Sequence, residues 1–283
     1  MSPWRLGGLS PAMLVRRLRK RLWEHEVVDR AAGLSYYFLF ALFPTLLFLT
    51  ALLGLLPGPK LMDRLLDYIG RVLPGDAASL LTKTLTEVVR GARGSLASIG
   101  VLAALWGAAS GMVSIRAALN VAHGTRDTRP WWRQRLEAVG LTVCFCLFTL
   151  LALILFVFGE RIGEAIADAL GVGAVFTRVW NLARWPALTL FALFGIMLVY
   201  QFAPAVRQRW RWVTPGSAVA LIGWLLASFT LRFYVQYFGN YNATYGSIGG
   251  VILLMLWFYL SSLTLLIGAE IDSVIRLAER DGP

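Results

Sequence analysis

The sequence predicts an all-α fold, a polytopic membrane protein built as a bundle of six transmembrane helices. Six apolar stretches are each long enough to cross a bilayer, whose hydrocarbon core takes about 20 helical residues. Apolar residues make up 58% of the 283 residues, and the mean hydropathy is +0.65. This apolar share exceeds the roughly 45–50% that is typical of soluble domains.

The six predicted spans fill most of the chain. They run from about 34 to 56, 96 to 121, 136 to 158, 186 to 202, 215 to 238 and 248 to 268. Pro44 lies near the middle of the first span and should act as its hinge by kinking the helix. Thr214 and Pro215 read as an N-cap followed by proline at the first helical position, which marks the start of the fifth span.

Shorter helices are expected outside the spans. Residues 13–28 are basic and amphipathic, a pattern that suits a helix lying on the headgroup surface. In the first outer connection, residues 61–73 and 77–89 have apolar residues at helical spacing but are too polar to span, which predicts two short interfacial helices. The chain therefore divides into a basic N-terminal segment (1–30), a transmembrane domain (31–275) and a cytoplasmic tail (276–283).

The orientation follows from the distribution of Lys and Arg between the connections. With the N-terminus inside, the inner segments hold 16 of these residues and the outer segments hold 9. We therefore expect a multi-pass protein of the plasma membrane with both termini in the cytoplasm.

The net charge of +11 and the residue types narrow the classes of function. Arginines cluster beside the apolar spans, where they can contact anionic lipid headgroups. We therefore expect membrane lipids as partners and no nucleic acid. Cys144 and Cys146 lie inside one span and suit packing. His25 and His123 are the only histidines and are not at metal-ligand spacing. No paired-carboxylate site, nucleophile elbow or phosphate loop is present, and we expect no enzyme, metal or cofactor.

Small residues at fourfold spacing predict close helix packing. Ala103, Gly107 and Gly111 line one side of the second span, and Gly246 and Gly250 open the sixth. Packing within the bundle is the favoured interpretation, and a dimer seam is the alternative, so an oligomer stays open.

Charges inside the spans are costly and are therefore informative. Arg116 lies near the cytoplasmic end of the second span, and Glu270 and Asp272 lie near that end of the sixth. The matched depth predicts an ion pair between Arg116 and Glu270. Arg232 lies in the outer half of the fifth span with no acid at its depth, and we expect it to face the bundle. Snorkelling or structural pairing is the alternative for all of these charges.

An uncharged aromatic stretch, residues 240–247, predicts a tight outer hairpin. The expected inward direction of Arg232 would bring it to this hairpin. The alternative to a functional role is that this stretch is only an interfacial turn, because Tyr is common at the membrane interface and Asn, Gly and Ser are common in turns. The polar candidates in this stretch are Tyr241, Asn242, Thr244 and Tyr245.

Three segments carry a resemblance to a known family. They are Ala31-Ala32-Gly33-Leu34-Ser35-Tyr36-Tyr37 up to Phe43-Pro44, then Trp106-Gly107 with Arg116-Ala117-Ala118-Leu119-Asn120, and Tyr241-Asn242-Ala243-Thr244-Tyr245-Gly246-Ser247 followed by Gly268-Ala269-Glu270-Ile271. Over residues 15–275 the chain resembles the YihY / virulence factor BrkB family. The resemblance implies a bacterial inner-membrane protein with six transmembrane helices and no settled activity, from a family that has also been labelled ribonuclease BN. Asp272 departs from the pattern, which has Asn there.

These observations favour a protein that transports or flips a lipid or an amphipathic anionic solute. The spans lack an acidic residue near the midplane, which opposes an ion-coupled carrier of polar substrates. Basic groups at both faces suit an anionic headgroup. The alternative from another class is a non-transporting envelope scaffold or virulence-associated membrane factor. Nuclease activity is disfavoured because the sequence has no clustered metal ligands.

Overall fold

The computed structural model describes residues 3–54, 95–170, 173–206, 213–238 and 241–281. Within these ranges the regular elements are seven α-helices and one short 3-10 helix, η1 (Pro3–Gly8), with no strand. The predicted all-α class is therefore confirmed for the described part of the chain.

Five helices are long and apolar enough to cross a membrane, judged by length and composition. They match the second to sixth predicted spans. The first predicted span coincides, as far as Gly54, with α2 (Val27–Gly54), a helix that contains Pro44. Its crossing of the membrane stays a prediction, and so does the count of six. The interfacial helices predicted at 61–73 and 77–89 lie outside the described residues. The five helices that carry these candidate spans are α5 (Ser95–Ala122), α6 (Trp131–Leu170), α7 (Gly173–Phe202), α8 (Pro215–Phe238) and α9 (Tyr241–Asp281).

Several helices are longer than the apolar stretches that predicted them. Pro186 lies inside α7 and does not begin it. Residues 241–247, expected to form a hairpin turn, are instead the first two turns of α9. An unsatisfied backbone group is costly in hydrocarbon, so a helix tends to continue through residues that would form a turn in water.

The basic N-terminal segment forms α1 (Pro11–Glu24), which is shorter than the predicted 13–28. Ser10 caps it, because the Ser10 Oγ accepts a hydrogen bond from the Met13 N–H at 3.3 Å. The chain then turns at His25 and Glu26, where Glu26 adopts a φ of 49°, and α2 begins at Val27. This turn separates α1 from α2.

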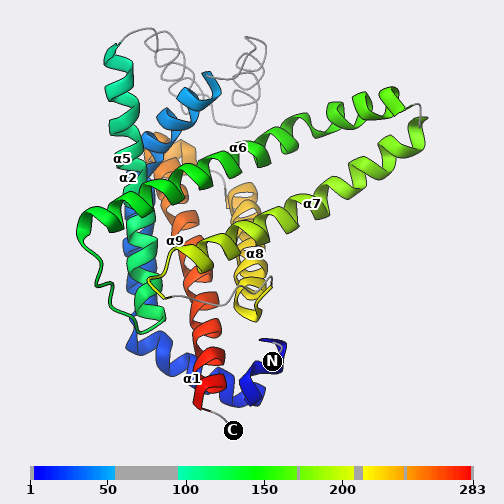
Figure 1. Ribbon diagram of the computed structural model, residues 1–283. Helices are drawn as coiled ribbons and strands as arrows, with labels where there is room; N and C mark the ends of the chain where they lie inside the picture. The colour runs from blue at the N-terminus through cyan, green and yellow to red at the C-terminus, as the bar shows by residue number, and fades with distance from the viewer. Residues whose placement is uncertain (1–2, 55–94, 171–172, 207–212, 239–240, 282–283) are drawn as a thin grey trace.

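The helices are arranged as a packed group and a projecting pair (Figure 1). In the group, α9 packs against α2, α5 and α8, and α2 also packs against α5. The α6 and α7 helices pack on each other and extend together to one side, while α1 crosses the end near the C-terminus. The larger core cluster lies at that same end, and its fully buried members include Ala31, Leu119 and Ala269.

Small residues mark the closest helix approaches. A Cβ added at Gly107 would lie 2.9 Å from the Pro44 Cγ, so this glycine lets α2 and α5 meet. Gly111 packs next to Ala41 in the same interface. Ala103 is exposed, and an added Cβ at Gly250 would meet nothing within 4 Å. The side-chain environment of Gly246 lies outside the described part.

Candidate functional site

Glu270 of α9 is a buried carboxylate, with 1% of its side chain exposed. The Arg21 Nε donates to its Oε2 at 2.9 Å, and the His25 Nδ1 lies 2.5 Å from its Oε1. The Arg21 Nη2 also donates to the Ala122 carbonyl oxygen at 2.8 Å, at the end of α5. A buried charge must be paired to be tolerated. Glu270 therefore fastens α1 to the bundle, and we call this contact the clasp.

Arg116 does not pair with Glu270, so that prediction is wrong. The Arg116 Nη2 donates to the Glu137 Oε2 at 2.5 Å, and its Nη1 donates to the Gln134 carbonyl oxygen at 3.1 Å. Its Nε lies 3.1 Å from the Asp127 Oδ2. Asp127 lies in the connection between α5 and α6 and Glu137 in the second turn of α6, so both acids that reach Arg116 follow it closely in sequence.

Arg129 completes this second ionic network. It donates from Nε to the Asp127 Oδ1 at 2.9 Å and from Nη1 to the Glu137 Oε2 at 2.5 Å. Burial alone would raise the pKa of Asp127, but hydrogen bonds from Arg129 and the charges of Arg129 and Arg116 outweigh it and hold that pKa below its ordinary value of 3.8. The carboxylate therefore stays ionised at neutral pH.

Asn120 and Asp272 hold backbone groups at the same end of the bundle. The Asn120 Oδ1 accepts a hydrogen bond from the Ala205 N–H at 2.7 Å. Asp272 accepts from the Gly216 N–H at 2.8 Å and from the Thr214 hydroxyl at 2.5 Å. A carboxylate at the first turn of α8 satisfies a free N–H and complements the helix dipole. These contacts give both residues a structural role.

Arg232 is exposed on α8 and does not face the bundle, contrary to the prediction. It makes no ion pair with any residue in the described ranges. Its expected approach to the 240–247 stretch is untested, because the side chains there lie outside the described part; these are Tyr241, Asn242, Thr244 and Tyr245.

A glycine face that was not predicted from the sequence joins α6 to α7. The Trp180 Nε1 donates to the Gly159 carbonyl oxygen at 2.6 Å, and the Trp180 ring covers Gly163 so closely that no Cβ would fit. A Cβ at Gly159 would lie 2.6 Å from the Arg184 Cδ. The fourfold spacing of Gly159 and Gly163 was the available signal.

Arg184 of α7 lies inside the apolar stretch Phe176–Phe202, although the sequence placed it in an outer connection. Its Nε is buried without a hydrogen-bond partner, and its guanidinium lies 5.8 Å from the centre of the Trp185 ring. It makes no ion pair within the part of the chain that the structure describes. An arginine at the centre of a bilayer costs about 2.5 to 3.5 kcal/mol on insertion scales. Arg184 packs against Gly159 of α6, just beyond the apolar stretch Trp131–Phe156, a depth at which a lipid headgroup phosphate could reach it.

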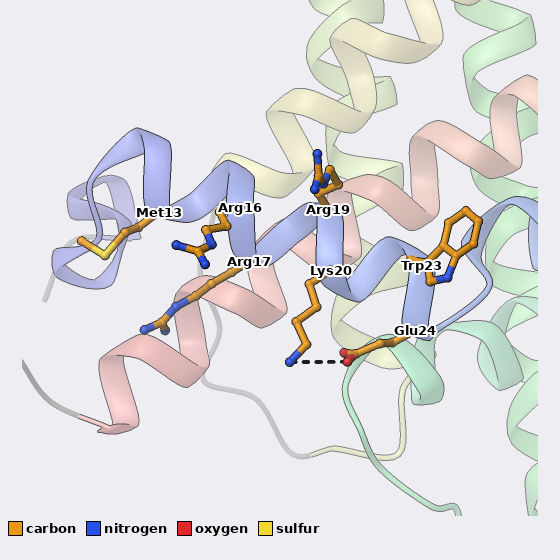
Figure 2. A pocket seen from close by; sticks show the side chains of 7 residues that line it. All are labelled: Met13, Arg16, Arg17, Arg19, Lys20, Trp23 and Glu24. Carbon is orange, nitrogen blue, oxygen red and sulfur yellow. Dashed lines mark ion pairs between the residues drawn. The ribbon is translucent and has the colours of Figure 1, made fainter.

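The outer side of α1 presents a basic surface with an open hollow of about 830 Å³ (Figure 2). Four cations and one acid line it together with Trp23, which is 87% exposed. The Lys20 Nζ lies 3.6 Å from the Glu24 carboxylate, a surface pair of small energetic weight. We call this set the α1 surface; its members are Met13, Arg16, Arg17, Arg19, Lys20, Trp23 and Glu24.

Elsewhere in the described ranges, no group of three or more His, Cys, Asp or Glu side chains is placed to hold a metal ion. Cys144 is exposed and Cys146 is buried, and both thiols are free. The polar residues described above, at the end of the bundle near the C-terminus, make ionic and capping contacts between helices.

Long apolar helices, with their ionic contacts gathered at one end, define a multi-pass membrane protein. Residues 18–283 match the family described as Virulence factor BrkB. The chain belongs to that family, and the predicted resemblance is confirmed. No solved structure matches the chain.

Relatives with curated descriptions cover most of the chain. The ribonuclease-like protein YfkH of Bacillus subtilis is 38% identical over 93% of this chain and 94% of its own length. A UPF0761 membrane protein of Chromohalobacter salexigens is 30% identical over 91% of this chain and 62% of its own length. Another, from Stenotrophomonas maltophilia, is 26% identical over 89% of this chain and 59% of its own length. This chain thus spans about three fifths of the two UPF0761 proteins, and all three relatives are bacterial.

Proposed function

We propose that this protein moves an anionic lipid, or an amphipathic anionic solute, across the bacterial inner membrane. The observation that carries the proposal is Arg184, a cation within an apolar span that has no acidic partner in the described residues. A lipid phosphate is the anion available at that place, and the guanidinium fork suits it.

The positions of further cations support a substrate that is present in both leaflets. Arg232 lies in the half of α8 away from the termini, and Arg184 lies in the corresponding half of α7. The α1 surface adds four cations at the opposite end. Cations at both ends favour an anionic headgroup over a cationic or neutral one.

The test is lipid movement in vesicles that contain the purified protein. Fluorescent phosphatidylglycerol is placed in both leaflets, and a membrane-impermeant reductant then bleaches the outer label. The protein should raise the bleached share from about half toward completeness. Arg184→Gln should slow the movement at least tenfold, while Arg126→Gln, which changes an exposed cation in the α5–α6 connection, should leave it unchanged. No movement above that in protein-free vesicles, with or without an imposed proton gradient, would contradict the proposal.

One observation favours the alternative, a non-transporting envelope scaffold. Arg232 is exposed on α8, where an inward direction was expected for a residue that binds substrate. An exposed cation can instead snorkel to a headgroup or contact another membrane protein. The vesicle experiment separates the two functions, because a scaffold moves no lipid.

A further inference from the structure

Helix α1 is held to the bundle on one side and left open on the other. Arg21 and the adjoining His25 reach inward to the clasp at Glu270. None of the residues of α1 is fully buried, although the helix lies against α9. The clasp therefore fixes the position of α1 while its opposite side faces away from the protein.

The open side combines positive charge with apolar side chains. Trp23 is 87% exposed, Val15 is 63% exposed and Met13 is 49% exposed. Four cations lie among them, and Glu24 is the single acid of the helix. Cations alone would suit any polyanion, but a large exposed indole beside them suits the boundary between headgroups and acyl chains.

The direction of α1 agrees with such a boundary. The helix runs across the ends of α2, α5 and α9, transverse to those helices (Figure 1). Figure 2 shows its long side chains spreading outward from this transverse axis. A helix transverse to membrane-spanning helices lies parallel to the bilayer plane, where the exposed Trp23 can enter the headgroup region and the cations beside it can meet phosphates.

We propose that α1 is a docking surface for an anionic bilayer leaflet, with Trp23 and its apolar neighbours entering the headgroup region beside the cations. The partner is the bilayer surface itself, recognised by its charge and its polar–apolar boundary. This docking does not require that the protein transports anything, so it stands or fails separately from the proposed function.

The docking can be measured by spin labelling in nanodiscs. Cys144 and Cys146 are changed to Ala, and a nitroxide is attached to a Val15→Cys variant of the full chain. The collision rates with oxygen, which enters the bilayer, and with a soluble nickel chelate then report the position of α1. In discs of phosphatidylcholine with one third phosphatidylglycerol, the label should be protected from nickel. In phosphatidylcholine alone, or in 1 M salt, where charge is screened within about 3 Å, it should be exposed.

The α1 surface is then neutralised by four changes, Arg16→Gln, Arg17→Gln, Arg19→Gln and Lys20→Gln, which leave the clasp intact. A cation near an anionic leaflet contributes roughly fivefold to binding, so the docked-to-free ratio should fall on the order of a hundredfold or more. The control with Arg126→Gln and Arg133→Gln, two exposed cations outside α1, should behave as the parent does. Trp23→Ala should reduce the protection of the label in the anionic discs.

Three results would overturn the proposal. One is equal nickel access in neutral and anionic discs. Another is that inorganic phosphate, at matched ionic strength, protects the label from nickel in neutral discs, which would indicate a small-anion site. The third combines two observations. An added polyanion such as heparin protects the label from nickel in neutral discs, and Trp23→Ala has no effect in anionic discs. Together these would indicate a soluble acidic partner.

Discussion

Single buried charges determine how the C-terminal end of the bundle is assembled. Glu270 and Arg116 have 1% and 3% of their side chains exposed, so each must be neutralised by a partner. Glu270 is reached by α1, and Arg116 is reached by the α5–α6 connection. Removing one member of such a pair costs more than the pair itself contributes, because the remaining charge stays buried.

The clasp should show energetic coupling between Arg21 and Glu270. Each single change, Arg21→Gln or Glu270→Gln, should destabilise the protein by about 2 to 4 kcal/mol, less than a fully buried pair would lose because Arg21 is partly exposed. The double variant should cost clearly less than the sum, by about 1 to 2 kcal/mol. Unfolding in mixed micelles, followed by fluorescence, gives these values.

The matched control is the same set of single and double variants at Arg116 and Glu270, two residues that do not contact each other. Arg116→Gln and Glu270→Gln should add within about 0.5 kcal/mol, because these residues bind different partners. Coupling in this control and additivity in the clasp would reverse the assignment of partners.

His123, just beyond the span of α5, should make the protein sensitive to acid. Burial and the nearby Arg276 charge lower its pKa from 6.5 to about 3. The unfolded chain therefore binds a proton at His123 at a higher pH than the folded chain does. Its contribution to stability is complete above pH 6.5 and is lost as the pH falls from about 6.5 to 3. His123→Gln should flatten the fall in melting temperature across this window; an unchanged pH profile would contradict the assignment.

At the scale of elements, the α6–α7 pair depends on its glycine face. Trp180 and the Arg184 stem lie where side chains on Gly159 and Gly163 would have to be. Both glycines lie just beyond the apolar stretch Trp131–Phe156 of α6, and such close packing, together with the hydrogen bond from Trp180 to Gly159, holds the two helices against each other.

Gly163→Leu should therefore separate α6 from α7, while Gly140→Leu on the same helix should not, because an added Cβ at Gly140 meets nothing within 4 Å. Cysteines introduced at facing positions of the two helices should lose disulfide cross-linking in the Gly163 variant only. The expected cost is about 1 to 3 kcal/mol, as for other overpacked sites. Equal cross-linking in both variants would show that the pair does not rely on this face.

Hydropathy located the spanning helices well because length and apolar content are local properties. The N-cap at Thr214 was also predictable, and the Ser217 N–H donates to its Oγ1 at 3.1 Å. The partner of Arg116 was not predictable, because Asp127 lies in a connection whose path depends on tertiary folding. The place of Arg184 was missed for a related reason: Pro186 read as a helix start, although neighbouring structure can accommodate a proline inside a membrane helix.

At the scale of the whole molecule, the arginine distribution predicts cytoplasmic termini. An alkaline phosphatase fusion after Pro74 should therefore be active, because that connection is expected outside, and a fusion after Pro130 should be inactive. The enzyme folds only in the oxidising space outside the inner membrane. The opposite pattern of activity would invert the topology, and it would also place the α1 surface on the outer leaflet.

One helix joins the two ends of the molecule without interruption. α9 has 41 residues, which at 1.5 Å per residue make a rod of about 60 Å, twice the thickness of the hydrocarbon core. It carries Tyr241 at one end and Glu270 near the other. A hydrogen-bonded helix is stiff along its axis, so a shift of α9 along that axis where α1 is fastened would also move the first turn of the helix, beyond its apolar stretch.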